Sequence, residues 1–299
     1  MLSQQELHGI FVPVITPFLQ DYELDLPSYH HYLKSLLSYD IQGLVINGTT
    51  GEAPTVAWEE VVQVVEETRG SLGGRLLPLI IGTGTNDTVS SLKRTELAGH
   101  IGADAVLVVT PYYSRPSIDG ILQHFRRVAE VGIPVILYEV PSRTGIRLPV
   151  DVIRRIMEIP GVIGMKDSTE STEHMRSLSH YDTKPVLCGN DVLFHEMLVH
   201  GASGGILASA NVNTEVFIRV FQLAAQGDYS RSEMEFEGLL PYIRKLFEES
   251  NPAPLKWLLA KQGIISSDTL RLPMGPITEK LKLSLDHAIQ QLKNTDFSV

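Results

Sequence analysis

Eight short apolar runs recur along the first 210 residues, and this repetition limits the possible folds more than any other feature. They are rich in β-branched residues and lie at 10–16, 43–48, 76–82, 105–110, 133–139, 162–166, 185–189 and 204–208. Near-continuous apolarity is typical of strands that are covered on both faces, as in parallel sheets. The sequence therefore predicts eight buried parallel strands.

Segments with helical spacing of apolar residues separate most of these runs, for example 28–39, 55–70 and 119–132. Eight strands that alternate with helices predict an α/β fold, a (β/α)₈ TIM barrel, rather than an open doubly wound sheet. From about residue 225 only helical patterns appear. We therefore expect a barrel over residues 1–224 and a C-terminal helical region over residues 225–299.

Composition and charge argue against several classes of partner. The chain has 299 residues, 43% of them hydrophobic, and a formal net charge of −10, which disfavours nucleic acid and anionic membranes. Cys188 is the single cysteine, so no disulfide framework is expected. No apolar stretch is long enough to span a bilayer, and the first residues lack the basic start of a signal peptide. We expect a cytoplasmic protein.

A lysine ends one of the apolar runs. Barrel active sites lie at the carboxyl ends of the strands, where Lys166 closes "VIGMK". Lys184 precedes the next strand, at the opposite end, and the other eight of the ten lysines lie on helical or polar segments, where a solvated amine is expected. Partial desolvation lowers the pKa of an amine and frees it for attack on a carbonyl. The alternative is a surface lysine or an ion-pair partner.

Other polar groups follow neighbouring strands. Tyr138 ends the strand before Lys166 and could relay protons, or it could bond a backbone carbonyl. Arg143 could clamp a carboxylate or lie exposed. Thr49 and Thr50, in "GTTG", could hold a carboxylate together with backbone N–H groups, although ordinary turns also use these residues.

The sequence favours neither a metal nor a phosphate site. The ten histidines form no His-x-His or His-Glu-x-x-His pattern, so we expect no metal and no cofactor. Acidic pairs such as Glu59–Glu60 are expected on solvated helix faces. The glycines of "SGGI" (203–206) could bind phosphate, but close passage of the backbone is the favoured interpretation.

Four motifs at strand ends carry a family resemblance: "GTTGE" (48–52), "TPYY" (110–113), "YEVPSRTG" (138–145) and "GMKDST" (164–169). In this order they resemble the dihydrodipicolinate synthase / N-acetylneuraminate lyase family, whose members are Schiff-base-forming, pyruvate-dependent class I aldolases on a (β/α)₈ barrel. The resemblance covers nearly the whole chain. "ESNPAPLKWLL" (249–259) and "LRLPM" (270–274) are similar to the C-terminal region of the synthase branch.

The resemblance implies catalytic roles for four residues. Lys166 matches the lysine that forms an imine with pyruvate, Tyr138 the tyrosine that relays protons, and Thr49 its hydroxyl partner. Tyr113 resembles the tyrosine that crosses a tight dimer interface into the neighbouring site. A homotetramer built as a dimer of dimers is implied in the same way.

Substrate-binding roles follow from the same resemblance. Thr50 matches the threonine that helps to bind the pyruvate carboxylate, and Arg143 the arginine that binds the carboxylate of aspartate semialdehyde. Gly189 and Ile206 fall where backbone groups line the lysine pocket.

The implied activity is condensation of pyruvate with (S)-aspartate 4-semialdehyde to 4-hydroxy-tetrahydrodipicolinate, in lysine and diaminopimelate biosynthesis. The alternatives are cleavage of a sugar-derived 2-keto acid, of the N-acetylneuraminate or 2-keto-3-deoxygluconate type, and a barrel that has lost catalysis. Arg143 favours the carboxylate-bearing acceptor. The filled catalytic positions argue against loss of activity.

Two departures from the family pattern stand out. Glu139 occupies a position that is usually asparagine, where it could alter the proton relay or simply point outward. Trp58, Val61 and Ser90 replace the residues that mark members inhibited by lysine. We therefore predict weak or absent inhibition by lysine.

Overall fold

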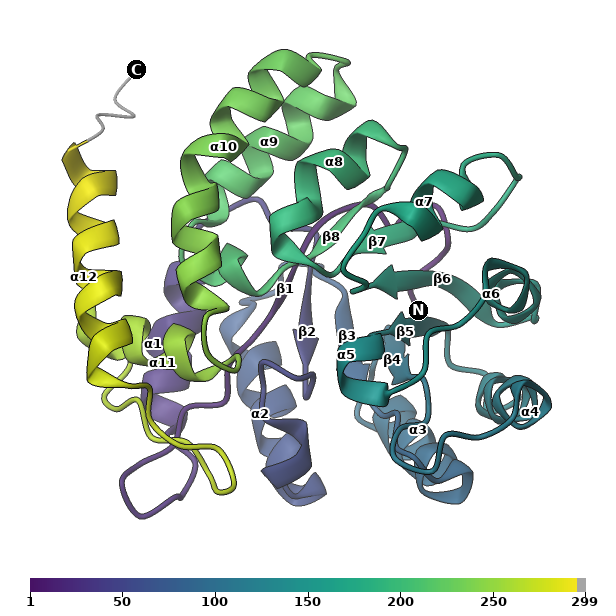
Figure 1. Cartoon of the computed structure of the whole chain (residues 1–299). Helices are drawn as coiled ribbons and strands as arrows, with labels where there is room; N and C mark the ends of the chain where they lie inside the picture. Colours follow the sequence, from purple (N-terminus) through teal and green to yellow (C-terminus); the bar gives the residue numbers. More distant parts are fainter. Residues whose placement is uncertain (295–299) are drawn as a thin grey trace.

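The computed structural model describes residues 1–294 and confirms the (β/α)₈ barrel (Figure 1). Eight parallel strands close on themselves in sequence order. The strands are β1 (Gly9–Pro13), β2 (Gly43–Ile46), β3 (Leu79–Gly82), β4 (Ala105–Val109), β5 (Val135–Glu139), β6 (Val162–Asp167), β7 (Val186–Cys188) and β8 (Gly204–Ile206).

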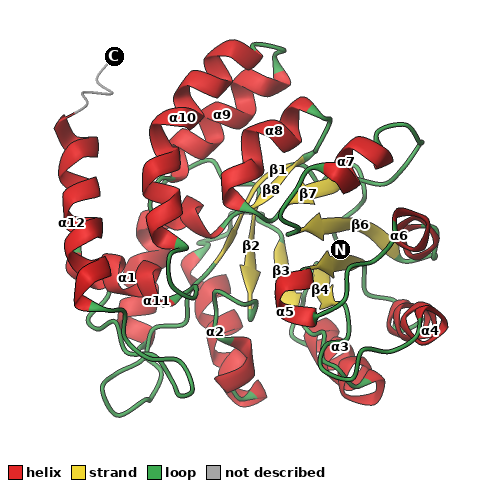
Figure 2. Cartoon of the chain, in the orientation of Figure 1, coloured by secondary structure: helices red, strands yellow, loops and turns green. Residues whose placement is uncertain are grey.

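Helices surround the strands and cover the outer face of the barrel, as Figure 2 shows. They are α1 (Leu26–Leu36), α2 (Trp58–Ser71), α3 (Thr88–His100), α4 (Ile118–Ala129), α5 (Pro141–Thr144), α6 (Val150–Met157), α7 (Glu173–Leu178), α8 (Phe194–Val199) and α9 (Thr214–Ala225). Three short 3₁₀ helices lie in the loops after strands: η1 (Ala53–Thr55), η2 (Asp191–Leu193) and η3 (Ala208–Asn211). All three predicted helices are confirmed, with bounds that differ by a few residues.

Two apolar layers explain why the strand segments are nearly continuously hydrophobic. One layer fills the barrel interior and includes Phe11, Ile136 and Tyr138, while the other lies between strands and helices and includes Val135 and Leu137. Successive side chains of a strand point to opposite faces. Tyr138 on β5 therefore points into the barrel, and its neighbour Glu139 points away from it.

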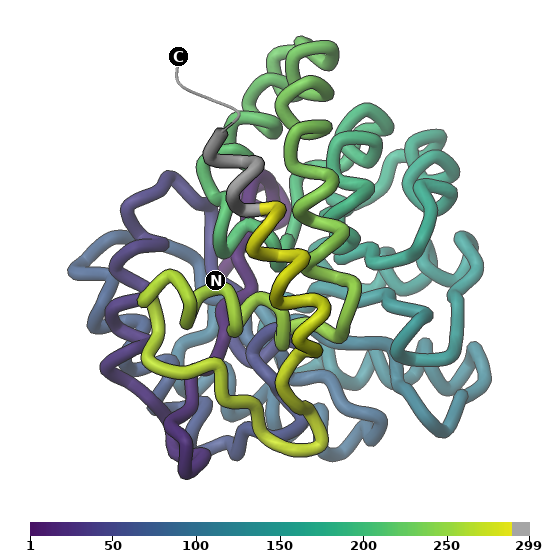
Figure 3. The backbone as a smooth tube through the Cα atoms, turned by 60° about the vertical axis from the view of Figure 1, so that its left-hand side comes forward, coloured from purple at the N-terminus to yellow at the C-terminus, as the bar shows by residue number. Residues whose placement is uncertain are grey.

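The helical patterns after residue 225 form α10 (Tyr229–Leu246), α11 (Ala253–Lys261) and α12 (Glu279–Asn294). Phe236 and Ile243 of α10 belong to the same apolar core as the barrel helices. Helix α12 runs alongside α10 on the outside of the molecule (Figure 3), where Leu281 packs with Tyr242. The division of the chain at residue 224 stays a prediction.

A backbone crossing explains the glycines of the "SGGI" segment. A Cβ on Gly204 would lie 2.0 Å from the carbonyl oxygen of Gly9 on the adjacent strand, and Gly204 has a φ of +146°. Only glycine fits such an approach. The interpretation of these glycines as a close backbone passage is confirmed.

The surface roles expected for two charged residues are wrong. Lys256 of α11 is fully buried and its Nζ lies 2.7 Å from Glu52 Oε1. Glu60 accepts a hydrogen bond of 2.7 Å from the Arg271 guanidinium, and it also accepts one from the backbone N–H of Ala57 at the start of α2. Each partner is far away in the sequence or outside the helix, so the helical pattern contained no sign of the pairing.

Lys184, in contrast, lies where it was expected, at the amino end of the barrel, and donates to the carbonyl oxygens of Ile159 and Val162. Within residues 1–294, no helix is both long and apolar enough to cross a membrane.

Candidate active site

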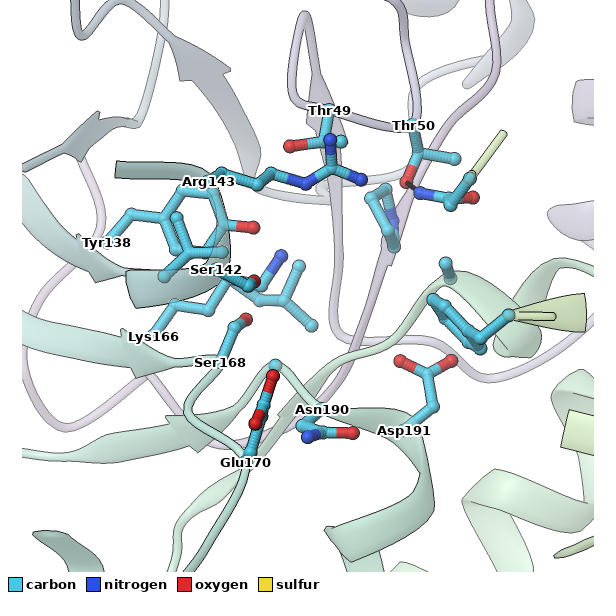
Figure 4. Close-up of a pocket in the computed structure, with 17 residues that line it drawn as sticks. Thr49, Thr50, Tyr138, Ser142, Arg143, Lys166, Ser168, Glu170, Asn190 and Asp191 are labelled. Carbon is cyan, nitrogen blue, oxygen red and sulfur yellow. Dashed lines mark hydrogen bonds between the residues drawn. The ribbon is translucent and has the colours of Figure 1, made fainter. Parts of the chain in front are cut away.

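A cavity of about 320 Å³ opens at the carboxyl end of the barrel (Figure 4). It is lined by residues at the carboxyl ends of six strands (β1, β2, β5, β6, β7 and β8) or in the loops after them, and by Phe247 and Asn251 from the C-terminal region. Seven of the eight predicted site residues line it: Thr49, Thr50, Tyr138, Arg143, Lys166, Gly189 and Ile206. Loops that are distant in sequence therefore converge on one site, as barrel geometry requires.

Lys166 lies at the inner end of this cavity and is 7% exposed. Its Nζ lies 4.4 Å from the centre of the Tyr138 ring, because Tyr138 and Lys166 are register partners on β5 and β6. Among the described residues, no hydrogen bond or ion pair engages this Nζ. The amine is thus mostly shielded from solvent and uncommitted, as a nucleophile should be.

Gly189 makes room for the lysine side chain. A Cβ at this position would lie 2.6 Å from Lys166 Cε and 2.1 Å from Ser168 Oγ. Real Cβ atoms do not approach so closely, so any other residue here would displace the lysine. Ile206 of β8, which is buried, completes the apolar wall.

Tyr138 is buried beside this amine. Burial alone would raise the pKa of the phenol, but the positive charge of Lys166 opposes burial, and the neighbouring Thr49 and Ser168 hydroxyls and Arg143 act in the same direction. The net result is a pKa of Tyr138 below its ordinary value. A phenol of lowered pKa next to an amine is suited to proton transfer.

The Thr49–Thr50 loop is held from the C-terminal region. Thr50 is buried, and its Oγ1 accepts a 3.0 Å hydrogen bond from Asn251 Nδ2, the dashed line in Figure 4. Glu52 ends the loop in the left-handed region at φ +56° and is anchored by Lys256. A residue two hundred positions away therefore sets the orientation of Thr50.

Arg143 lies on the short helix α5 at the rim of the cavity. This helix spans Pro141–Thr144 and is capped by Gly145, whose φ of +72° suits glycine. The arginine is exposed and also lines the cavity, and its guanidinium reaches over the space between Thr49 and Tyr138 (Figure 4). It can meet a charged substrate that enters from solvent.

Asp191 was not among the predicted site residues, although it ends the stretch "CGND" (188–191), which begins at the last residue of β7. It is buried, lines the cavity, and accepts a 2.6 Å hydrogen bond from the Ser209 backbone N–H. Burial raises its pKa, against the opposing effects of that hydrogen bond and of Lys166. Its position after a barrel strand was the signal that could have identified it.

Tyr113 is the predicted residue that does not line this cavity. Its side chain is 89% exposed, on a loop in which Tyr113 and Arg115 both have positive φ, at +69° and +49°. A large exposed aromatic side chain on a strained loop is unusual for a surface with no partner.

Glu139 does not enter the cavity. It is fully buried on the outer face of β5, where Oε1 accepts from the Leu148 N–H at 2.8 Å and Oε2 is hydrogen-bonded to Thr110 Oγ1 at 3.0 Å. Of the two orientations considered for this residue, the structure has the one that points away from the barrel interior.

A barrel with a shielded, uncommitted lysine beside a buried tyrosine belongs to the class of enzymes that activate carbonyl compounds through an amine. The family model of the dihydrodipicolinate synthetase family matches residues 6–292, and the chain belongs to this family.

Curated relatives are similar to this chain over almost its full length. The 4-hydroxy-tetrahydrodipicolinate synthase 2 of Clostridium acetobutylicum is 37% identical over 286 residues, which cover 94% of this chain and 99% of the relative. The corresponding synthase of Thermomicrobium roseum is 38% identical over 277 residues, covering 91% and 90%.

Solved structures of dihydrodipicolinate synthases are also similar to this chain over almost its full length. The chloride-inhibited dihydrodipicolinate synthase of Acinetobacter baumannii, in complex with pyruvate, superposes with a TM-score of 0.92 at 34% identity, covering 96% of this chain and 99% of that one. A monomeric variant of a dihydrodipicolinate synthase superposes equally well, with a TM-score of 0.92 at 31% identity, covering 97% and 98%.

Proposed function

We propose that this protein condenses pyruvate with (S)-aspartate 4-semialdehyde to give 4-hydroxy-tetrahydrodipicolinate, a step of lysine and diaminopimelate biosynthesis. The observation that carries the proposal is the uncommitted Lys166 amine, which faces Tyr138 at the inner end of the cavity. The names of the curated relatives and the pyruvate complex of a similar synthase support it.

In the first half-reaction the neutral amine of Lys166 attacks the keto carbon of pyruvate. Tyr138 delivers the proton with which the carbinolamine oxygen leaves as water, and an imine is formed. Thr49 stands beside the phenol and assists this relay, while Thr50 and the backbone of its loop hold the pyruvate carboxylate. Loss of a methyl proton then converts the imine into a nucleophilic enamine.

In the second half-reaction the enamine carbon attacks the aldehyde of the semialdehyde, whose carboxylate is bound by Arg143. The amino group of the new chain then attacks the imine carbon. This closes the ring, releases the Lys166 amine and restores the enzyme. Gly189 and Ile206 keep the lysine side chain in place through both halves.

We further propose that Tyr113 completes the proton relay in a neighbouring subunit. Its exposure and strained backbone support such a role, and a homotetramer built as a dimer of dimers would supply the neighbour. The biosynthetic names of the relatives favour the cytoplasm as the location.

The sugar-derived 2-keto acid alternative gains nothing from the structure. Glu139, where the sequence departs from the family pattern, is buried on the outer face of β5 and does not line the cavity. Arg143 at the rim favours an acceptor that carries a carboxylate.

The test is consumption of pyruvate by the purified protein with and without aspartate semialdehyde. We expect consumption only when the semialdehyde is present, and a pyruvate adduct on Lys166 after borohydride reduction, detected by peptide mass. An adduct without consumption would mean that the acceptor is wrong. If Lys166 carries no adduct, the proposed function fails.

A further inference from the structure

A buried cluster of ionisable groups lies directly behind the Schiff-base site. Tyr138 and Lys166 are register partners on the inner face of β5 and β6, and the next pair along the same strands is Glu139 and Asp167. These two carboxyl groups therefore share the outer face of the sheet. Both are buried, as is His174 on α7, whose Nδ1 lies 3.7 Å from Asp167 Oδ2.

The hydrogen bonds of this cluster are unequal. Glu139 is bonded through both oxygens, to the Leu148 N–H and to Thr110. Asp167 Oδ1 accepts from the Thr169 N–H at 2.9 Å, while Asp167 Oδ2 and His174 Nδ1 are buried without a hydrogen-bond partner among the described residues. One imidazole can therefore balance one of the two carboxylates but not both.

Two ionisable groups of neighbouring elements act on Glu139: Asp167 of β6 and His174 of α7. Cys188 of β7 lies opposite Asp167, and burial raises its pKa, so it remains a neutral thiol. Arg147, next to Leu148, points to the surface and pairs with Glu173.

Burial is the largest influence on Glu139 and raises its pKa, and the charge of Asp167 acts in the same direction. The hydrogen bonds from Leu148 and Thr110 and the proximity of His174 only partly offset this. The contacts of Thr110 also indicate that Glu139 carries a proton. Its Oγ1 lies 3.0 Å from Glu139 Oε2 and 3.4 Å from the Tyr138 carbonyl oxygen, but one hydroxyl has one proton to donate. Both contacts are satisfied together when Glu139 carries the proton.

We propose that Glu139 is a positioning residue of the reaction proposed above, kept as a neutral carboxylic acid that donates to Thr110 Oγ1, while Thr110 donates to the Tyr138 carbonyl oxygen. Asp167 and His174 form the other pair of the cluster, 3.7 Å apart. The β5 backbone at Tyr138 is fixed by the protonated acid.

Ionisation of Glu139 has a definite chemical consequence. Without its proton Glu139 cannot donate to Thr110, and the Thr110 hydroxyl turns from the Tyr138 carbonyl oxygen to the carboxylate. The new negative charge lies next to Tyr138 in the strand and opposes formation of a phenolate. Proton transfer through Tyr138 should therefore weaken at alkaline pH as Glu139 loses its proton.

The test compares the pH dependence of kcat/KM for pyruvate in the wild type, Glu139→Gln and Glu139→Leu. Glutamine copies the neutral acid, and we expect kcat/KM within about threefold of wild type at the optimum and an alkaline limb at least about half a pH unit higher. Leucine leaves the Leu148 N–H and Thr110 without a partner, and kcat should fall at least about tenfold. Thermal unfolding confirms that each variant is folded.

Two results overturn the proposal. One is a Glu139→Gln profile whose alkaline limb coincides with that of the wild type. The other is a loss of activity in Glu139→Gln as large as that in Glu139→Leu, because the ionised form would then be the working one.

Infrared spectra of the resting wild-type protein provide a second test that needs no turnover. We expect the C=O stretch of a protonated carboxyl group at neutral pH, shifted by Thr110→Val and lost along the alkaline limb. Absence of a band that responds to Thr110→Val contradicts the proposal, even if Glu139→Gln does not fold. A wild-type protein that forms no borohydride-trapped pyruvate adduct refutes the proposed function instead, and the infrared band still decides whether Glu139 is protonated.

Discussion

Two lysines in the described part of the chain are almost inaccessible to solvent, and they differ in what their amines bind. Lys256, at the junction between α11 and the barrel, is 0% exposed, and its Nζ donates to the carbonyl oxygens of Thr16 and Thr269 and to Glu52. Lys166, at the barrel mouth, is 7% exposed and faces the ring of Tyr138. Only the first amine has all three donors committed.

The difference shows what distinguishes a structural lysine from a reactive one. Burial lowers the pKa of Lys256, but the charge of Glu52 and its hydrogen bond hold the proton on the amine. An amine in that setting has neither a free lone pair nor room for a substrate. Lys166 lines a cavity and, among the described residues, has no carboxylate bound to it, so its amine is accessible to a carbonyl substrate.

Replacement of the reactive lysine should have the largest effect on activity. Lys166→Met removes the nucleophile, and we expect kcat/KM to fall at least about a thousandfold with no loss of stability. Steady-state rates and denaturant unfolding measure the two quantities. An undiminished pyruvate adduct after borohydride treatment of this variant would show that another lysine is the nucleophile.

Replacement of the structural lysine should instead lower stability and leave adduct formation intact. Lys256→Met leaves the buried Glu52 carboxylate unpaired, and the free energy of unfolding should drop by about 3–5 kcal/mol. The matched control is Lys256→Met combined with Glu52→Gln, which removes the unpaired charge and should recover much of the loss. Folded Lys256→Met protein should still form the Lys166 adduct. Failure to form it would contradict the assignment of a structural role to Lys256 and a reactive role to Lys166.

A smaller effect should come from the hydrogen bond between Asn251 of the C-terminal region and Thr50 at the barrel mouth. Asn251→Ala removes the hydrogen bond to Thr50 Oγ1, and a loss of about 1 kcal/mol corresponds to a KM for pyruvate about fivefold higher. The control is a double-mutant cycle with Thr50→Val. If the two effects simply add, the hydrogen bond does not carry the influence of Asn251.

The smallest effect should be that of free lysine on the rate. Val61 of α2 is buried in the apolar core and offers no polar atom to an amino acid, and Ser90 starts a different helix. We expect that about 1 mM lysine changes the rate by less than about twofold. An inhibition constant for lysine below this concentration would contradict the prediction.

The parts of the site that could be predicted share one property. Lys166, Tyr138 and Gly189 each lie at the end of a strand whose apolar run is visible in the sequence, and barrel geometry brings all strand ends together. Asn251 and Lys256 lie in a helical region with no such rule. Their partners Thr50 and Glu52 are about two hundred residues away, and a helical pattern contains no information about which distant loop it will meet.

Glu139 illustrates the same limit within a single strand. Strand alternation places it on the face opposite Tyr138, but its partners come from β6, from α7 and from the loops after β4 and before α6. Whether a buried carboxyl group is ionised depends on those partners.

The sequence by itself determined the eight-stranded barrel, the helices around it and the lysine at the mouth, because strand and helix periods and strand-end motifs are local properties of the chain. The tertiary structure alone decided which buried lysine is locked in an ion pair, which helix supports Thr50 and what faces Glu139. These depend on contacts between segments far apart in the chain, and the energy of a buried charge is set by such contacts rather than by its neighbours in sequence.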